Sequence, residues 1–251
     1  MAKGRARLAI GQGLSLWVLD APEGFGDADF HAHHALQITL CLEGELALAD
    51  QDRLVRAPAV AVAADRVHRI EASGLFAFIF VEPESRLGRG LATALFGEGK
   101  LVAVEGTGFA PWTEQLRSTF DTHPDNAALL AAGQGVAEAI APGTEAGLDD
   151  LRVQRIIDYA SSHLDQALNL NGAANGIHLS PSRLRHLFVE QTGLAFKTYL
   201  LWLRLVRAVQ VYSEGNSLTE AAHAAGFSDS AHFSRVFRRT FGLPATTLTR
   251  I

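Results

Sequence analysis

The stretch "SLTEAAHAAGFSDSAHFSRVFRRTFG" covers residues 217–242 and has the pattern of two helices joined by a tight turn. Gly226 can end the first helix in the left-handed conformation, and Phe227 follows it as a residue suited to the core. Ser228 or Asp229 can then cap the second helix. The second helix is rich in Arg, so it is basic enough to enter the major groove of DNA. Together these features predict a helix-turn-helix.

A second copy of this pattern lies upstream. "LRHLFVEQTG" at 184–193 aligns with "FSRVFRRTFG" at 233–242, and each run ends in a Gly that can close a helix. Between the copies, "FKTYLLWLRLVRAVQVYSEG" at 196–215 predicts one helix of ~30 Å at 1.5 Å per residue. A rigid spacer of that length can set two recognition helices near the ~34 Å repeat of successive major grooves. The sequence therefore predicts two helix-turn-helix units joined by a long helix.

The net charge of −5 is distributed unevenly along the chain. Residues 1–148 carry 11 Lys and Arg against 19 Asp and Glu, a net of −8, whereas residues 149–251 carry 11 against 8, a net of +3. Five further His in the second part can add positive charge. This asymmetry favours a polyanion as a partner of the second part only, although two solvated surfaces of opposite charge give the same totals.

The first 82 residues are typical of short apolar strands, rich in Val, Ile and Phe and separated by Gly, Pro or charged turns. Strands at this spacing predict a small β-barrel or sandwich. After residue 85 the apolar residues recur at i, i+3 and i+4, which predicts helices. The expected strands are "LSLWVLD", "LQITLCLEG", "ELALAD", "RLVRAP", "AVAVAADRVHRIEA" and "LFAFIFVEP".

These patterns predict an α+β chain of several domains, with β-structure first and an all-α domain last. "APGTEAGLDD" at 141–150 combines Pro, Gly and acids, as a linker does. His123, in "DTHPDN", is expected in a loop. We expect the helices over 86–141 to pack on the barrel and to carry dimer contacts and the relay between domains. The expected boundaries are a sensor barrel at 1–85, the helical segment at 86–141, a linker at 142–150 and a DNA-binding domain at 151–251.

The composition also bears on the compartment. No apolar run reaches the ~18 residues that a membrane span needs. The basic start "MAKGRARLAI" is not followed by an apolar segment of signal-peptide length. The single Cys41 excludes an internal disulfide and fits a reducing compartment. We therefore expect a cytoplasmic protein with no membrane partner.

The run 217–242, with "RLVRAV" at 204–209 before it, resembles the DNA-binding domain of AraC/XylS-type transcription regulators. The resemblance covers roughly residues 149–251. It implies two helix-turn-helix units that bind adjacent major-groove segments of double-stranded promoter DNA. The expected partners are promoter DNA, a second copy of the chain in a homodimer and, for an activator, RNA polymerase.

The resemblance also implies which side chains face the DNA. An Arg can donate two hydrogen bonds to guanine O6 and N7, and a Ser can read several bases weakly. Lys and Arg near phosphates add salt-dependent affinity. For each position the alternative is a solvated surface residue. In the second unit the base-reading positions are Ser230, Ser234 and Arg235, with Arg238 and Arg239 nearer phosphates. In the first unit the matching positions are Ser182, Arg185 and His186, and the phosphate candidates are Lys197, Arg204 and Arg207.

The first unit departs from the family pattern. Ala173 and Ala174 replace the usual Leu-Ala pair. His178 stands where the turn Gly is expected, and Gly176 falls inside the short helix. A Gly within a helix costs about 1 kcal/mol relative to Ala. We therefore expect a first unit that is loosely ordered, or ordered only on DNA.

Three of the ten His fall within four positions of "HAHHALQITLCLEG". Along a strand, residues of equal parity share a face, so His31, His33 and Gln37 are expected on one face and His34 on the other. The spacing resembles the cupin metal motif H-x-H-x3-E-x6-G, with Gln37 in place of the Glu, and implies a cupin-like β-barrel. His68, in "AADRVHRIE", is the candidate for the remaining ligand on a neighbouring strand.

Three imidazoles and one carboxamide oxygen suit Zn, Fe, Mn, Ni or Cu, and the ligand set does not choose among them. A metal-free polar pocket and purely structural histidines are the alternatives. The leading hypothesis is a sequence-specific DNA-binding transcription regulator, controlled by a small-molecule or metal effector in the N-terminal barrel. The rival is a cupin-type metalloenzyme, a dioxygenase or isomerase, with a helical appendage. We expect no turnover, because no second carboxylate, Tyr or Lys is expected beside the histidines as acid or base.

Overall fold

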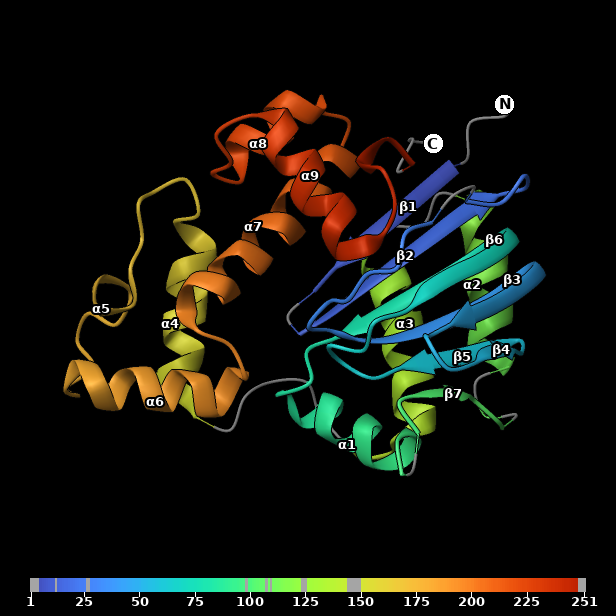
Figure 1. The fold of residues 1–251 in the computed structure, drawn as a ribbon, viewed down its shortest axis with the longest axis horizontal. Helices are drawn as coiled ribbons and strands as arrows, with labels where there is room; N and C mark the ends of the chain where they lie inside the picture. The colour runs from blue at the N-terminus through green and yellow to red at the C-terminus, as the bar shows by residue number, and fades with distance from the viewer. Residues whose placement is uncertain are drawn as a thin grey trace. The chain divides into compact units, whose positions relative to one another are not determined.

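The computed structural model describes residues 5–11, 13–25, 28–97, 99–106, 108, 110–122, 126–143 and 150–247 (Figure 1). The chain divides into two compact units. The first unit is Met1–Ala146 together with Phe237–Ile251, and the second is Gly147–Val236. Most of the linker expected at 142–150, and His123, lie outside the described residues.

The first unit is built on one antiparallel sheet. The pairing order is β1-β2-β6-β3-β5-β7, and β4 pairs with β3 off this path. Among the described strands the path has two ends, β1 and β7, so the sheet is open and the closed cupin-like barrel is not confirmed. Closure would need β7 to reach β1, but this three-residue strand pairs only with β5. The strands are β1 (Arg5–Ile10), β2 (Leu14–Ala21), β3 (Leu36–Ala49), β4 (Leu54–Arg56), β5 (Ala59–Val62), β6 (Arg69–Val81) and β7 (Leu101–Ala103).

The two longest strands, β3 and β6, each run through a break expected from the sequence. The strand expected at 59–72 is divided: its start is β5, and its end continues with the strand expected at 75–83 as β6. The two long strands run past the predicted break at Gly44 because Gly44 and Gly74 lie opposite each other in the pairing. Both have positive φ, +100° and +121°. A Cβ at Gly44 would lie 2.0 Å from the Ser73 carbonyl oxygen, and one at Gly74 would lie 2.1 Å from that of Glu43. Two glycines therefore let the strands bend at this point without ending.

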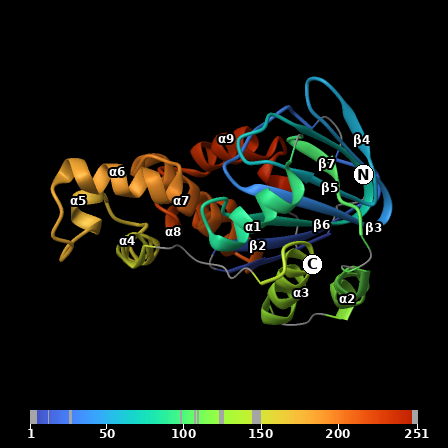
Figure 2. The same cartoon turned by 90° about the horizontal axis from the view of Figure 1, so that it is seen from below.

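Helices cover one face of the sheet. They fall within residues 86–141, where the sequence pattern predicts helices. They are α1 (Arg86–Leu95), α2 (Ala110–Thr122) and α3 (Asn126–Ile140), and α2 and α3 lie together against the sheet (Figure 2). Period-two alternation sends one set of side chains into this core, and burying each large one contributes ~1.5–3 kcal/mol. The core includes Leu16, Val18, Ile38 and Ile79 from the strands and Leu116, Phe120, Leu129 and Val136 from the helices.

The opposite face of the sheet carries the alternate residues, Trp17, Leu19, Phe78 and Phe80. The end of the chain packs there: Phe237, Phe241 and Leu243 are buried, and a short 3-10 helix follows at Ala245–Thr247. These apolar contacts explain why Phe237–Ile251, which the sequence-based boundaries assigned to the DNA-binding domain, groups with the first unit.

The second unit is all-helical, as predicted. α7, the joining helix, has 18 residues, or ~27 Å at 1.5 Å per residue. α9 begins in this unit, and its last turn belongs to the first. The helices are α4 (Leu151–Ser162), α5 (Leu170–Ala173), α6 (Pro181–Thr192), α7 (Phe196–Ser213), α8 (Leu218–Ala224) and α9 (Ser230–Phe241).

The first helix-turn-helix differs from its prediction at Gly176. Helix α5 ends at Ala173, so Gly176 lies beyond it and not inside it. Gly176 has a φ of +81°, the left-handed conformation that Gly adopts without cost, and therefore acts as the turn residue. Asn169 caps α5 by accepting a hydrogen bond from the backbone N–H of Gly172. The expected cost of a Gly within this helix does not arise at Gly176.

Among the described residues, no helix combines the length and the apolar character needed to span a bilayer.

Candidate functional site

The second helix-turn-helix consists of α8, a turn at Gly226 and α9. Ser217 and Glu220 form a capping box at the start of α8, which satisfies backbone N–H groups that a helix leaves free. Gly226 has a φ of +76°, and a Cβ there would lie 2.2 Å from the Leu164 carbonyl oxygen. Asp229 accepts from the backbone N–H of His232 at 2.6 Å, as the predicted cap of α9. Local sequence signals thus set the angle at which α9 leaves the turn.

The exposed side of α9 carries the residues that the resemblance assigns to DNA. Ser230 and Ser234 are half-buried, and Arg235 and Arg239 are exposed. The other side of the helix packs into the interior through Phe233, Val236 and Phe237. Because residues three and four apart share a helix face, Ser230 and Ser234 lie on one side together. The geometry is that of a recognition helix with a polar, basic outer face.

Helix α6 presents the corresponding residues of the first unit. Ser182, Arg185 and His186 are all exposed, and Lys197 is exposed at the start of α7. Ser180 caps α6, Pro181 occupies its first turn, and Gly193 ends it with a φ of +68°. The helix is anchored by the buried residues Leu184, Leu187 and Phe188. Its outer face is therefore available to a polyanion.

Two predicted phosphate contacts have other partners. Arg204 donates from Nε to the Leu164 carbonyl at 3.2 Å and from Nη2 to the Gln166 carbonyl at 3.0 Å. Burial lowers the pKa of this guanidinium. Arg207 is half-buried and donates to Oε1 of Gln210 at 3.0 Å. Arg204 therefore supports the segment after α4, and its contact with a phosphate stays a prediction.

Three histidines meet at one end of the sheet. His31 and His68 form an antiparallel bridge, each donating its backbone N–H to the other's carbonyl at 2.9 Å. With His33 they form a buried group whose ligand atoms lie within 4.8 Å of one another. Gln37, the second residue of β3, adds its amide. The sequence grouped these residues correctly, but His31 and His33 precede β3 and are gathered by the bridge to His68 and not by strand parity.

Each of these imidazoles has its Nδ1 next to a backbone carbonyl. The distances are 3.0 Å from His31 to Asp29, 2.9 Å from His33 to Ala35, and 2.8 Å from His68 to Arg66. A carbonyl can only accept, so in each neutral ring Nδ1 carries the proton and Nε2 keeps a lone pair. This is the orientation that metal-ligating histidines adopt when a second group holds the ring in place.

Burial keeps the cluster neutral. It lowers the pKa of His31, lowers that of His33 to about 4, and lowers that of His68 well below its usual value. For His33 and His68, repulsion from neighbouring imidazoles adds to this effect. A divalent metal requires neutral imidazoles whose Nε2 atoms carry no proton, and these three histidines meet that requirement at neutral pH.

The amide of Gln37 completes the cluster. Its Oε1 lies 2.9 Å from Nε2 of His33 and 3.3 Å from Nε2 of His68, while its Nε2 lies 2.8 Å from the Thr39 hydroxyl. In this orientation three lone pairs converge, which is unfavourable unless a cation lies among them. The alternative is an amide turned by 180°, whose two N–H groups donate to both imidazoles while Thr39 donates to its oxygen.

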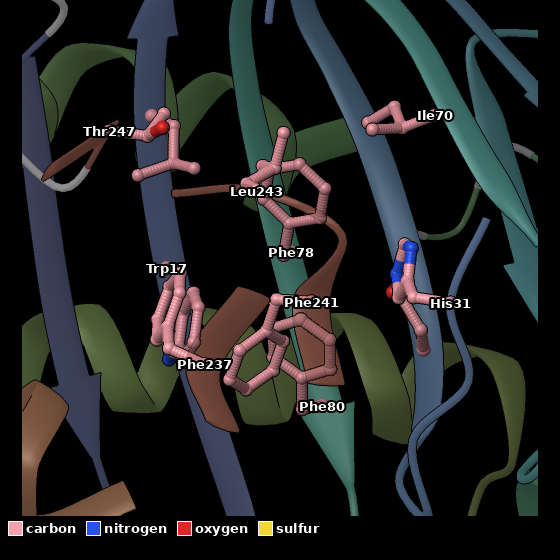
Figure 3. Close-up of a pocket in the computed structure, with 11 residues that line it drawn as sticks. Trp17, His31, Ile70, Phe78, Phe80, Phe237, Phe241, Leu243 and Thr247 are labelled. Carbon is pink, nitrogen blue, oxygen red and sulfur yellow. The ribbon is translucent and has the colours of Figure 1, made fainter. Parts of the chain in front are cut away.

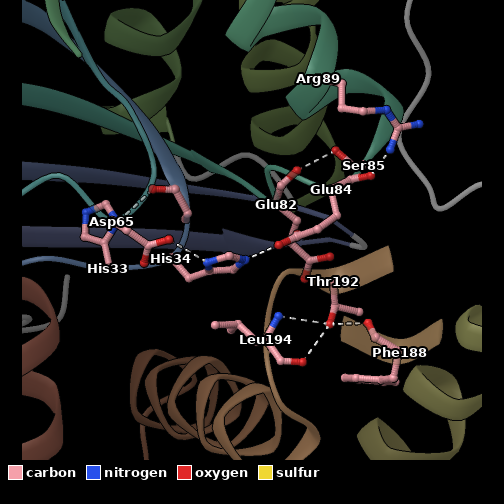
Figure 4. A network of polar contacts seen from close by, with 11 residues as sticks. His33, His34, Asp65, Glu82, Glu84, Ser85, Arg89, Phe188, Thr192 and Leu194 are labelled. Carbon is pink, nitrogen blue, oxygen red and sulfur yellow. Dashed lines mark hydrogen bonds and ion pairs between the residues drawn. The ribbon is translucent and has the colours of Figure 1, made fainter. Parts of the chain in front are cut away.

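His34 points away from the cluster, as expected, and it has charged partners of its own. It is held between the carboxylates of Glu84 and Asp65, the latter at 3.2 Å (Figure 4). Burial opposes protonation of His34, but the two carboxylates outweigh it and raise its pKa to about 9. The sequence missed this ion pair because Glu84 is 50 residues away along the chain.

A small apolar pocket adjoins the cluster (Figure 3). Its polar side chains are His31, Gln37 and Thr247, and Nε1 of Trp17 is buried with no hydrogen-bond partner among the described residues. The other lining residues are aromatic or aliphatic. The lining comprises Trp17, Leu19, His31, Gln37, Ile70, Phe78, Phe80, Phe237, Phe241, Leu243 and Thr247.

Comparisons with known sequences match the second half of the chain. The sequence model of a helix-turn-helix domain matches residues 173–251. The chain is 31% identical over 103 residues to the uncharacterised HTH-type transcriptional regulator YpdC of Escherichia coli K12. It is 36% identical over 94 residues to the HTH-type transcriptional activator RhaS of Escherichia fergusonii. The matches cover 41% and 37% of this chain but only 36% and 34% of these relatives, about a third of their length.

Comparison of structures extends over the whole chain. ToxT from Vibrio cholerae O395 is similar with a TM-score of 0.55, 13% identity and coverage of 100% of both chains. A structure of ToxT described as bound to an unsaturated fatty acid is similar with a TM-score of 0.53, at 13% identity, over 98% of this chain and 94% of that one. At these identities the likeness shows a shared fold, with a sheet-rich N-terminal part and a helical C-terminal part. Residues 173–251 of this chain therefore form a helix-turn-helix domain.

Proposed function

We propose that this protein is a sequence-specific DNA-binding transcription regulator, controlled by an effector bound in its first unit. The observation that carries the proposal is the pair of helices α6 and α9, each anchored by a buried apolar face. Each also exposes an Arg at its centre, Arg185 and Arg235. Both helices lie within residues 173–251, the region that matches the helix-turn-helix model. The similar proteins YpdC and RhaS are described as a transcriptional regulator and a transcriptional activator.

The proposed effector is a divalent transition metal, one of Zn, Fe, Mn, Ni or Cu. His31, His33 and His68 would hold it through Nε2, and Gln37 would add its carboxamide oxygen. The fit rests on the neutral rings, on the Nδ1 contacts that fix their orientation, and on the converging lone pairs. A metal there would tie the segment before β3 to the start of β6. From the cupin resemblance we retain this ligand set, without closure of the barrel.

A small molecule is the second candidate for the effector, and it is favoured by the apolar pocket beside the histidines. A buried pocket with a few polar groups at one end suits a ligand with an apolar body. ToxT, which shares the fold, has been described in a form bound to an unsaturated fatty acid. The metal and the small molecule are compatible, because the cluster forms only one end of the pocket.

The rival function, a metalloenzyme, is less well supported. Apart from His31, the residues that line the pocket carry no carboxylate, amine or phenol to act as acid or base. The relatives that match by sequence are transcription regulators. We therefore propose a regulator that is not an enzyme. It would act as a homodimer through α1, α2 and α3, bind promoter DNA, and contact RNA polymerase if it activates.

Selection of genomic fragments by the full-length protein tests the proposal, followed by fluorescence anisotropy on the selected DNA between 50 and 200 mM salt. We expect binding that weakens steeply with salt, because phosphate contacts release counterions. Arg185→Ala or Arg235→Ala should weaken binding about 5- to 150-fold, whereas Arg56→Ala at the exposed end of β4 should leave it unchanged. Absence of selected fragments and of affinity at 50 mM salt would contradict the proposal.

A further inference from the structure

The end of the chain is anchored on the sheet of the first unit. Phe241 lies 4.6 Å from Trp17 and 5.6 Å from Phe80 between ring centroids, and Phe237 stacks on Trp17 at 6.2 Å (Figure 3). Phe241 also lies 6.0 Å from the imidazole of His33. Phe237 and Phe241 lie in the last turn of α9, the helix that carries Arg235. The packing places that turn directly beside the histidine cluster.

One residue, Asp29, joins this turn to the cluster by three polar contacts. Its backbone N–H donates to the Gly242 carbonyl at 2.9 Å. Its carboxylate accepts from Nε of Arg238 at 2.6 Å. Its own carbonyl accepts from Nδ1 of His31 at 3.0 Å. Asp29 and Arg238 belong to the same unit, and both side chains are about half exposed, so solvent and ions can reach the pair.

The approach at Gly242 requires glycine. Gly242 has a φ of +69°, and a Cβ there would lie 2.4 Å from Nδ1 of His31 and 2.5 Å from the Asp29 carbonyl oxygen. The segment around Asp29 and the end of α9 thus fit against each other through backbone as well as side chains. The Asp29–Arg238 ion pair is therefore held in place by backbone packing on either side of it, and not by the attraction of two surface charges alone.

We propose that Asp29 is an autoinhibitory residue that competes with a DNA phosphate for Arg238. The inference rests on the proposed function, since Arg238 is one of the side chains that the family resemblance assigns to the DNA backbone. A carboxylate and a phosphate take the same guanidinium donors, so Arg238 cannot give Nε to both at once. While Asp29 holds it, the protein has one phosphate contact fewer.

The size of the effect follows from the exposure of the pair. Exposed ion pairs are weak, so DNA can displace Asp29 at the cost of a modest loss of affinity. Removing the carboxylate should therefore tighten DNA binding about two- to fivefold. The dependence of log affinity on log salt should change by less than the ~0.9 of one phosphate contact, because Arg238 reaches the phosphate in both complexes. A general change in net charge would tighten binding without depending on Arg238.

The test is a double-mutant cycle in the full-length protein, by anisotropy on genomically selected DNA across a salt series. Asp29→Asn should bind about two- to fivefold more tightly than wild type, without the ~0.9 change in salt slope that a new phosphate contact would give. Arg238→Gln should bind more weakly than wild type, and adding Asp29→Asn to it should change nothing further. Glu105→Gln removes an exposed carboxylate elsewhere in the same unit and is the matched control.

If Asp29→Asn tightens DNA binding equally with and without Arg238, or no more than Glu105→Gln does, the competition between Asp29 and DNA for Arg238 is wrong, while the proposed function stands. If wild type and every variant lack affinity for the selected DNA, the proposed function fails and the inference fails with it. Circular dichroism of Asp29→Asn and of a second variant, Asp29→Ser, checks that any change in binding is not a loss of fold.

Discussion

At the scale of the residue, Gln37 decides what the histidine cluster can hold. Its amide faces Nε2 of both His33 and His68, so either its oxygen shares a cation with them or its nitrogen donates to them. Replacing the amide by a carboxylate removes the second option and adds a negative charge at the ligand position. The ligand chemistry of the site therefore depends on this single side chain.

We predict that Gln37→Glu binds Zn²⁺ at least tenfold more tightly than wild type, because a carboxylate is a stronger ligand for a divalent cation than a carboxamide. Gln37→Leu should bind it more weakly. Competition with a chromogenic chelator, on protein purified without an affinity tag, measures both. Gln134→Glu, the same change on the exposed side of α3, is the control. If all four proteins bind Zn²⁺ equally, Gln37 is not a ligand.

Arg204 and Lys197 make a second contrast at this scale. Arg204 donates to two carbonyls of its own unit, whereas Lys197 is exposed at the start of α7. Arg204→Ala should lower the free energy of unfolding by about 1–3 kcal/mol, because it leaves the partly buried Leu164 carbonyl without this donor. The salt slope of DNA binding should not change. Urea unfolding and the anisotropy salt series measure the two quantities.

Lys197→Ala is predicted to do the reverse. It should leave the unfolding free energy within about 0.5 kcal/mol of wild type and reduce the salt slope by about 0.9. Should Arg204→Ala instead flatten the salt slope without loss of stability, Arg204 is a phosphate contact and the structural role given to it here is wrong.

At the scale of the element, β3 and β6 depend on the facing glycines at their bend. Gly74→Ala is predicted to lower the free energy of unfolding by about 2–4 kcal/mol, since the new Cβ meets the Glu43 carbonyl oxygen at 2.1 Å and φ is +121°. Gly97→Ala is the matched control, because nothing lies within 4 Å of a Cβ there. Equal unfolding midpoints for the two variants would show that the bend does not need glycine.

The helices could be predicted from sequence far better than the sheet. Capping by Ser217 and Asp229, and turns at Gly193 and Gly226, are local signals within a few residues, so α6, α8 and α9 lie where they were expected. Strand pairing is not local. The runs at β3 and β6 appear broken at glycines, but the structure pairs these glycines with each other and continues both strands. Whether the sheet closes depends on β1 and β7, whose pairing no local pattern reveals.

The candidate sites were predictable in part for the same reason. The spacing of His31, His33 and Gln37 identified the cluster, and His68 was found as the remaining histidine of that region. What sequence could not supply was the partner of each charged group: Glu84 for His34 and Asp29 for Arg238 lie 50 and 209 residues away. Such pairs are made by the tertiary fold alone. The carbonyl partners of Arg204 likewise belong to another segment, so the sequence did not indicate them.

At the level of the whole molecule, the proposed regulator joins an effector site to a DNA-binding domain. Coupling between them means that the effector changes the affinity for DNA, and by thermodynamic linkage DNA changes the affinity for the effector. The histidine cluster and the last turn of α9 belong to one compact unit, and α9 also carries Arg235. The chain thus contains a continuous element that both sites can influence.

The most direct test is the affinity of the full-length protein for selected DNA, measured with EDTA and with Zn²⁺, in wild type and in His33→Ala. We predict DNA binding in both proteins, with affinity that changes about 5- to 150-fold with Zn²⁺ in wild type and not in His33→Ala. The range corresponds to typical coupling between two sites. A protein that binds Zn²⁺ through these histidines but has the same DNA affinity with and without it, or no DNA affinity at 50 mM salt, would contradict the account.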